Sequence, residues 1–371
     1  MAFRPKLLIT GANGFIGGAL LAKLIASPLW KDTVCLVRAD SPEEGLLRLA
    51  RTLRSHEITT QQLLSLTLDQ VICGDLNMVT RWIDDSRIAS IERVVNLAAL
   101  ASFGNHPLIW PTNVDAVLSM AHGLSHRCHL KRFIHVGTAM ACGHDSPNPI
   151  PEGYDQGPDA PHFLEYTESK YEIERLLKKE LPDFPLVIAR PSIVVGHTKT
   201  GCKASGSIYW VFRMALALKT FPCRLDQRID VIPVDYCADA LYLLLTKPKL
   251  QHAWYHISAG KKQSSSFKEI DAAIAKTMKR PPMKSYRQKS YGEILEMRGQ
   301  FKKLLGECNT LIVAKAIKTY GSFSKLELAF DHQRLIAEGM PEPTPLAKYV
   351  GLCEKTSQGI LISEQMKFDY K

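Results

Sequence analysis

A tyrosine and a lysine four residues apart are the first side chains in this sequence that could do chemistry together. Tyr166 and Lys170 lie near the start of a segment, residues 163–180, that has a helical composition. A spacing of i,i+4 places both side chains on one face of a helix. A free phenol has a pKa of about 10, and a neighbouring ammonium group favours the phenolate and lowers that pKa. The pair therefore predicts an acid–base centre, although a solvated helix face would show the same spacing.

A hydroxyl group at the end of an apolar segment supplies a third candidate. Residues 133–136 are expected to form a buried strand, and Gly137 and Thr138 follow directly. Ligands of open α/β folds bind at the carboxyl ends of the strands, where the Thr138 hydroxyl could donate to a carbonyl oxygen. The alternative is a strand-end residue that bonds its own loop. Thr138, Tyr166 and Lys170 are the predicted catalytic residues.

A glycine-rich loop connects the first expected strand, residues 6–10, with the first expected helix, residues 15–27. Its spacing is G-x-x-G-x-x-G, with Gly11 for the tight turn, Gly14 for close approach of a pyrophosphate and Gly17 for close helix–strand packing. The amides of a helix N-terminus attract an anion. The loop predicts a dinucleotide site, with further contacts from Asn13, Phe15 and Ile16. A strand–helix turn without a ligand is the alternative.

The end of the second strand discriminates between the two nicotinamide dinucleotides. An acidic residue there would favour NAD, but this sequence has Arg38, whose guanidinium group can pair with a 2′-phosphate. Arg48 could add a second contact. These residues favour NADPH over NADH, and Asp40 keeps an NAD site open as the alternative.

The other predicted cofactor contacts follow the ends of other strands. The small side chains after the fourth strand would let the cofactor lie against the backbone, and residues after the sixth would meet the nicotinamide amide. Two of these predictions have simple alternatives: Asp75 could be a turn residue and Asn113 a helix cap. The predicted contacts are Asp75, Leu76, Ala98, Ala99, Asn113, Pro191 and Ile193, with Lys170 on the nicotinamide ribose.

Strand-like and helix-like segments alternate along the first half of the chain. The expected strands are residues 6–10, 33–37, 70–73, 93–97, 133–136 and 186–189, and they are apolar on both faces. Such strands, separated by helices, indicate a parallel sheet covered on both sides, and right-handed crossovers make it a doubly wound α/β (Rossmann) fold. We expect a dinucleotide-binding domain at 1–258, with a substrate-side insertion at about 197–228, and a smaller, mostly helical substrate cap at 259–371.

Composition limits the classes of partner. The chain has 371 residues, 46% of them hydrophobic, and a formal charge of +10, which favours anionic partners such as a phosphorylated cofactor, coenzyme A or an acidic carrier protein. A generally basic surface is the alternative. No basic run with interleaved aromatic residues supports a nucleic-acid site.

The nine cysteines form no C-x-x-C pair and His122, His126 and His129 lack a metal-site pattern, so no metal is expected. No stretch approaches the ~20 apolar residues of a membrane span, and we expect a cytoplasmic protein.

The first 260 or so residues resemble the extended short-chain dehydrogenase/reductase superfamily. Within it, the sequence is most similar to the group of fatty acyl-CoA reductases (male-sterility type) and carrier-protein thioester reductases. Three stretches carry this similarity: residues 35–39 with Arg48-Leu49, residues 166–171 with Glu174, and residues 190–196. Two residues depart from the family pattern. Gly137 stands where serine is common, and Tyr171 where tryptophan is common.

The resemblance implies residue roles and an activity. Tyr166 would donate the proton, Lys170 would lower its pKa, Thr138 would bind the substrate carbonyl, and Arg38 and Arg48 would hold the 2′-phosphate. The implied enzyme is an NADPH-dependent reductase that converts an acyl thioester, delivered by coenzyme A or an acyl carrier protein, to an aldehyde or alcohol. A dehydrogenase or epimerase acting on a sterol, a small alcohol or ketone, or a nucleotide sugar would use the same three residues. A dinucleotide-binding regulator without turnover is the third hypothesis.

Overall fold

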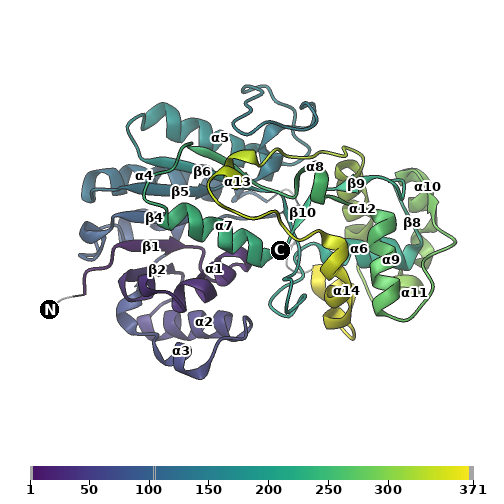
Figure 1. Ribbon diagram of the computed structural model, residues 1–371, viewed down its shortest axis with the longest axis horizontal. Helices are drawn as coiled ribbons and strands as arrows, with labels where there is room; N and C mark the ends of the chain where they lie inside the picture. The colour runs from purple at the N-terminus through teal and green to yellow at the C-terminus, as the bar shows by residue number, and fades with distance from the viewer. Residues whose placement is uncertain (1–2, 103, 105, 367–371) are drawn as a thin grey trace.

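A seven-stranded parallel sheet forms the centre of the computed structural model, which describes residues 3–102, 104 and 106–366 (Figure 1). The strand order is β11-β6-β5-β4-β1-β2-β3, and every neighbouring pair is parallel. The order reverses between β1 and β4, and ligands of doubly wound folds bind at that point. The predicted fold class is therefore confirmed. The strands are β1 (Leu7–Thr10), β2 (Thr33–Val37), β3 (Val71–Cys73), β4 (Arg93–Asn96), β5 (Arg132–Val136), β6 (Leu186–Pro191) and β11 (Trp254–Ile257).

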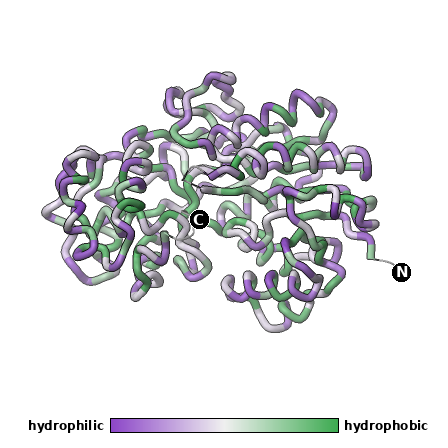
Figure 2. Tube along the Cα trace, turned by 180° about the vertical axis from the view of Figure 1, so that it is seen from behind, coloured by the Kyte–Doolittle hydropathy of each residue, from purple (hydrophilic) through white to green (hydrophobic). Residues whose placement is uncertain are grey.

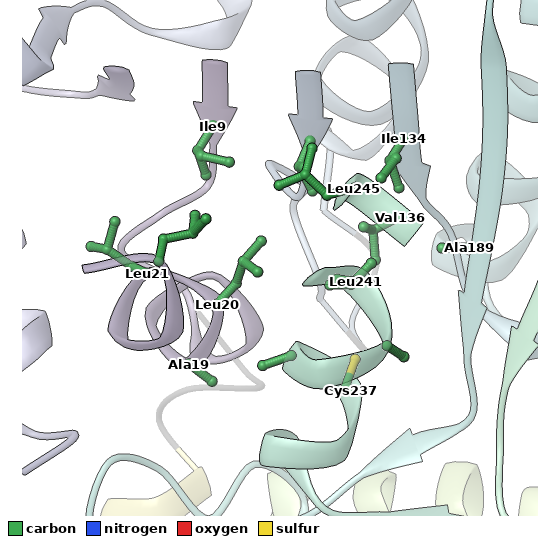
Figure 3. Close-up of a cluster of buried hydrophobic side chains, with 14 of the residues drawn as sticks. Ile9, Ala19, Leu20, Leu21, Ile134, Val136, Ala189, Cys237, Leu241 and Leu245 are labelled. Carbon is green, nitrogen blue, oxygen red and sulfur yellow. The ribbon is translucent and has the colours of Figure 1, made fainter. Parts of the chain in front are cut away.

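Helices cover both faces of this sheet because its strands bury apolar side chains on both sides. One face packs against α1 (Phe15–Ile25), α2 (Pro42–Arg54) and α7 (Val234–Thr246), and the other against α4 (Ala116–Arg127) and α5 (Glu165–Glu180). Figure 3 shows side chains of α1 and α7 directed at strand residues such as Ile9 and Val136. Hydrophobic residues run along the strands, and hydrophilic ones mark the outward turns of the helices (Figure 2).

A smaller, mostly helical part lies beyond the carboxyl ends of the strands (Figure 1). Its helices enclose apolar clusters separate from those of the sheet. Three two-stranded ladders accompany them: β7 (Ile193–Val194) with β10 (Val231–Ile232), β8 (Thr220–Phe221) with β13 (Arg287–Gln288), and β9 (Arg228–Ile229) with β12 (Ser265–Ser266). The helices of this part are α6 (Tyr209–Leu218), α9 (Phe267–Thr277), α10 (Tyr291–Glu296), α11 (Phe301–Leu305), α12 (Thr310–Ser324), α14 (Leu346–Ser357) and α15 (Ile362–Met366). Three further short helices are α3 (Thr60–Leu64), α8 (Gly260–Gln263) and α13 (Gln333–Ala337).

Two buried carboxylates tie the last third of the chain to the sheet. Asp230 accepts hydrogen bonds from the backbone amides of Ala259 (2.7 Å), Gly260 (3.1 Å) and Phe330 (3.2 Å). Glu152 accepts from the amides of His256 and Arg334 at 2.9 and 2.6 Å. After the cap helices, the chain therefore comes back to the edge strand β11, and these hydrogen bonds connect the cap with the sheet. The domain boundary at residue 258 stays a prediction.

Among the described residues, no helix combines the length and the apolar character that crossing a bilayer requires. The same residues contain no cluster of three or more His, Cys, Asp or Glu side chains arranged to hold a metal ion. His122 instead lies 3.2 Å from Glu180, and His126 bonds the His122 carbonyl oxygen.

Candidate active site

The glycine loop approaches neighbouring backbone too closely for any side chain at two of its positions. Gly11 has φ +71°, and a Cβ atom there would lie 2.6 Å from the Ala98 nitrogen. A Cβ at Gly17 would lie 2.1 Å from the Gly11 carbonyl oxygen. The helix that follows, α1, has Gly14 as its N-cap and receives no side-chain cap from the part of the chain that the structure describes. Its first amides therefore suit an anion such as a pyrophosphate.

Three strand ends are joined beneath this loop by a buried polar network. The Thr10 hydroxyl donates to Asn96 Oδ1 at 2.6 Å and accepts from the Ala98 amide at 3.2 Å. Asn96 Nδ2 lies 3.1 Å from Nδ1 of His135. The network links β1, which leads into the glycine loop, with β4 and with β5, which leads toward Thr138. No such role was expected for these three residues, although polar residues at the ends of buried strands are a signal that could have found them.

The three predicted catalytic residues line one cavity together with the glycine loop. This catalytic cavity contains about 1330 Å³ of unfilled space, part of it continuous with solvent. Its position at the carboxyl ends of β1, β4, β5 and β6 is the one expected for a doubly wound sheet. The predicted site residues on its wall are Gly11, Gly14, Phe15, Ile16, Gly17, Ala99, Thr138, Tyr166, Lys170, Pro191 and Ile193.

Helix α5 presents Tyr166 and Lys170 to this cavity from consecutive turns. Lys170 is 2% exposed, and its Nζ atom donates to the Val136 carbonyl oxygen at 2.9 Å. Burial lowers the pKa of Lys170 to about 8, against a smaller opposing effect of Glu174. Burial also raises the pKa of Tyr166 to about 12. Burial thus moves the pKa of this phenol upward, opposite to the lowering expected from the sequence, because desolvation disfavours the phenolate.

Thr138 stands at the start of a short helical turn, Ala139–Cys142, where its hydroxyl oxygen accepts a hydrogen bond from the Met140 amide at 3.3 Å. The side chain also lines the catalytic cavity. The alternative interpretation of Thr138, a strand-end residue that bonds its own loop, is therefore confirmed, and its contact with a substrate carbonyl stays a prediction. The hydroxyl oxygen accepts from its own loop, and its hydrogen can donate into the cavity.

A buried ion pair supports the helix from behind. Glu174 and Arg190 are both 1% exposed and their side chains approach to 2.5 Å. A Cβ atom at Gly137 would lie 2.2 Å from Glu174 Oε1. The glycine that departs from the family pattern therefore makes room for this carboxylate.

Other predicted cofactor residues lie away from the catalytic cavity. Asn113 is buried, accepts from the Leu100 amide at 2.7 Å and donates to Ser169 Oγ at 3.0 Å, so its amide braces the loop after β4 against α5. Asn13 donates to Thr52 on α2. The side chains of Leu76 and Ala98 pack in the apolar cluster of the α4 and α5 face.

The two arginines predicted to bind a 2′-phosphate lie together beyond the carboxyl end of β2, with Arg48 on α2. Arg38 is 75% exposed and lies 3.8 Å from the Asp75 carboxylate. Arg48 donates to the Arg38 carbonyl oxygen and lies 3.8 Å from Glu44. Asp75 also caps the following turn by accepting from the Asn77 amide at 2.9 Å. The Arg38 guanidinium is thus available to an anion on the solvent side.

Comparison with known proteins places the chain in a family. The family model described as "Male sterility protein" matches residues 9–241, which is more than half of the chain. The chain belongs to this family. The match runs from β1 into α7 and includes the glycine loop, Thr138, Tyr166 and Lys170. The cap beyond α7 lies outside it.

The chain covers very different shares of its relatives' own lengths. A probable fatty acyl-CoA reductase 5 from Arabidopsis thaliana is 22% identical over 75% of this chain and 71% of that protein. A non-canonical nonribosomal peptide synthetase, hkm10, from Aspergillus hancockii is 23% identical over 72% of this chain but only 28% of the synthetase. The chain thus spans less than a third of the length of that synthetase.

The fold of the male-sterility domain and its cap matches solved structures along almost the whole chain. The terminal R domain from the myxalamid PKS-NRPS biosynthetic pathway superposes with a TM-score of 0.77 at 21% identity, covering 98% of this chain and 93% of the R domain. Together with the family match, these similarities confirm the predicted resemblance of the chain to extended short-chain dehydrogenase/reductase proteins of the group that holds fatty acyl-CoA reductases and R domains.

Proposed function

We propose that the protein is an NADPH-dependent reductase of an acyl thioester, delivered by coenzyme A or a carrier protein and converted to an aldehyde or further to an alcohol. One observation carries the proposal: Thr138, Tyr166 and Lys170 line the same cavity as the glycine loop. The residues of that loop fit a dinucleotide, because Gly11 and Gly17 leave no room for a Cβ atom and the amides of α1 are uncapped among the described residues.

The protonation states suit reduction. When bound, the dinucleotide supplies a hydride to the carbonyl carbon of the thioester. The hydroxyls of Thr138 and Tyr166 donate hydrogen bonds to the carbonyl oxygen and stabilise the negative charge that develops there. Tyr166, with a pKa of about 12, holds its proton at neutral pH and transfers it to that oxygen. The resulting hemithioacetal breaks its C–S bond to release a thiol and an aldehyde. Lys170 keeps a positive charge beside the tyrosine as the proton leaves.

The distribution of charge supports an anionic donor. Residues 260–325 contain fifteen Lys or Arg residues and five Asp or Glu residues, so this stretch of the cap accounts for the whole formal surplus of +10. Coenzyme A and acidic carrier proteins both present negative charge around the thioester arm. Because the surplus of positive charge is concentrated in the cap, we favour an anionic donor over the alternative that the whole surface is generally basic.

The cofactor preference is part of the same proposal. The exposed Arg38 guanidinium would pair with the 2′-phosphate of NADPH. We expect Arg38→Ala to raise the KM for NADPH about tenfold and to leave the KM for NADH nearly unchanged. Arg51→Ala, on the exposed side of α2, is the matched control. Equal effects on both cofactors would remove Arg38 from this role.

The activity can be tested by NADPH oxidation with acyl-CoA, carrier-bound acyl groups and aldehydes. We expect Tyr166→Phe to lower turnover by about 10²–10⁴-fold. Tyr171→Phe is the matched control, because the Tyr171 hydroxyl bonds Asp155 (2.8 Å) and Tyr171 is not part of the catalytic cavity wall. Turnover that survives Tyr166→Phe would contradict the assigned role. Catalysis without net NADPH consumption would indicate an epimerase instead.

A further inference from the structure

The buried ion pair behind the catalytic helix lies next to Lys170. Glu174 follows Lys170 by four residues on α5, so one face of the helix carries both side chains. They reach consecutive residues at the end of β5. The Lys170 ammonium group donates to the Val136 carbonyl oxygen at 2.9 Å. The Glu174 carboxylate occupies the space that a side chain at Gly137 would need. A buried ammonium group and a buried carboxylate therefore lie side by side beneath the catalytic cavity.

These two charges act on each other through space. The hydrogen bonds of the Glu174 carboxylate come from Arg190, and the hydrogen bond of Lys170 goes to a backbone carbonyl oxygen. Burial favours loss of the Lys170 proton, and the negative charge of Glu174 opposes that loss. Charges that are screened by protein instead of water interact strongly, so the state of Glu174 matters to Lys170 without direct contact.

Arg190 is held against the Glu174 carboxylate on several sides. Its guanidinium group donates to Oε2 of Glu174 from Nε at 2.9 Å and from Nη2 at 2.5 Å. Its remaining nitrogen, Nη1, donates to the Tyr154 carbonyl oxygen at 3.4 Å, and its central carbon lies 4.5 Å from the ring centre of Trp254. A cation fixed in this position offsets part of the Glu174 charge at Lys170.

The other titratable groups around Lys170 are uncharged at neutral pH. Tyr166, on the same helix, has a pKa of about 12 and keeps its proton. His135 lies on β5, where burial and the cations of Lys170 and Arg190 lower its pKa well below the usual value, so it stays neutral. Among the described residues, the charges that act on Lys170 are therefore those of Glu174 and Arg190.

We propose that Glu174 and Arg190 are positioning residues for the proton transfer: Glu174 keeps the Lys170 side chain protonated, and Arg190 limits how strongly it does so. Without the Glu174 charge, Lys170 faces an uncompensated Arg190 and loses its proton at a lower pH. Without the Arg190 charge, the full carboxylate charge acts on Lys170 and the proton stays on to a higher pH. The pair thus sets the upper end of the pH range of catalysis. This inference rests on the proposed reductase activity.

The first test is the pH dependence of kcat/KM, measured with an acyl-CoA and NADPH. Glu174→Gln should move the alkaline decline to lower pH by about one unit, and Arg190→Gln should move it to higher pH by about one unit. The double variant carries neither charge, so its decline should return close to that of the original protein. A residue with a purely structural role would lower activity at every pH and would not shift the decline in opposite directions.

Glu172→Gln is the matched control, because the Glu172 carboxylate lies on the same helix and pairs with Arg175 at 2.6 Å. Its decline should stay in place. Single variants that leave the decline unshifted, or that shift it in the same direction, would overturn the proposal. Glu174→Asp keeps the pair but withdraws the carboxylate from the end of β5. It should give a smaller shift to lower pH, and it decides the question if the variants with an unpaired buried charge do not fold.

A labelling experiment separates failure of this inference from failure of the reductase activity. Acetylation by acetic anhydride over a range of pH, with the modified peptides quantified by mass spectrometry, reports the pKa of individual amines without turnover. Lys170 lines the catalytic cavity, where a small reagent can reach it. Opposite shifts of the Lys170 pKa in Glu174→Gln and Arg190→Gln support the inference even when no thioester is reduced. Thioester reduction with an unshifted Lys170 pKa in both variants refutes it and leaves the reductase in place.

Discussion

Gly137 shows how one residue beside the active site is constrained by a buried ion pair. Its missing side chain leaves the space in which the Glu174 carboxylate meets Arg190, and neither charge is exposed to water. Buried ions of this kind need partners, since an uncompensated buried charge costs several kcal/mol. The carboxylate therefore cannot move aside cheaply to admit a larger residue at position 137.

The first prediction concerns this position. Gly137→Ser restores the residue common in the family, and we nevertheless expect it to lower the free energy of unfolding by about 1–3 kcal/mol, because its Cβ would collide with Glu174. Denaturant unfolding measures the change. Gly299→Ser is the control, since a Cβ there meets no described atom within 4 Å. A Gly137→Ser protein as stable as the original would show that the ion pair can shift.

The second prediction concerns pH. Burial holds the pKa of Lys170 at about 8 instead of 10.5. The ammonium group is therefore present at neutral pH and is lost as the pH rises through about 8, so kcat/KM should fall about tenfold per pH unit above that value. The phenol of Tyr166, with a pKa of about 12, stays protonated over this range. In Lys170→Arg the charge persists, and any residual activity should lose this alkaline decline. A flat profile between pH 7 and 10 in the original protein would remove Lys170 from the proton-transfer step.

At the scale of elements, the sequence predicted the strands better than their surroundings. The strand expected at 33–37 is β2, and the one expected at 93–97 ends one residue earlier as β4. The helix that follows β4 begins as a π-helical turn, Pro111–Asp115, and becomes regular at Ala116, so Asn113, for which a helix cap was the alternative, lies inside that turn. Within that turn the Asn113 amide bonds the loop after β4 and Ser169. Hydrophobic periodicity is a local signal, so it does not report bonds to distant segments.

The third prediction tests a junction between elements. Asp230→Ala removes the acceptor for the amides of Ala259, Gly260 and Phe330, all in buried surroundings. Unsatisfied buried donors are costly, and we expect the free energy of unfolding to fall by about 3 kcal/mol. Asp226→Ala, whose side chain is 74% exposed, is the control and should change stability little. Similar stability of the two variants would mean that other bonds hold the cap to the sheet.

At the scale of the whole molecule, the surplus of positive charge and the predicted catalytic residues lie in different parts of the chain. The sheet carries the dinucleotide loop and the catalytic residues, whereas residues 260–325 of the cap carry the basic surplus. The positive electrostatic field of these cap residues raises the rate at which an anionic donor associates, and dissolved salt screens that field.

The fourth prediction follows from this separation. Raising the salt concentration from about 0.05 to 0.5 M should lower kcat/KM for an acyl-CoA or acyl carrier protein several-fold. The same acyl group on uncharged N-acetylcysteamine should show little change. Reversing two exposed charges, Lys302→Glu with Lys303→Glu, should reduce the salt dependence, whereas Lys31→Glu on the sheet side should not. Equal salt dependence for charged and uncharged donors would place donor recognition elsewhere.

The sequence by itself determined the parallel doubly wound sheet, the dinucleotide loop and the identity of the three catalytic candidates. These depend on residue types at short spacings and on strands that are apolar on both faces. Only the tertiary structure decided the strand order, the Thr10–Asn96–His135 network and the reason for Gly137. Each of these joins residues distant in the chain, and the protonation states of Tyr166 and Lys170 likewise follow from burial, which exists only once the chain has folded.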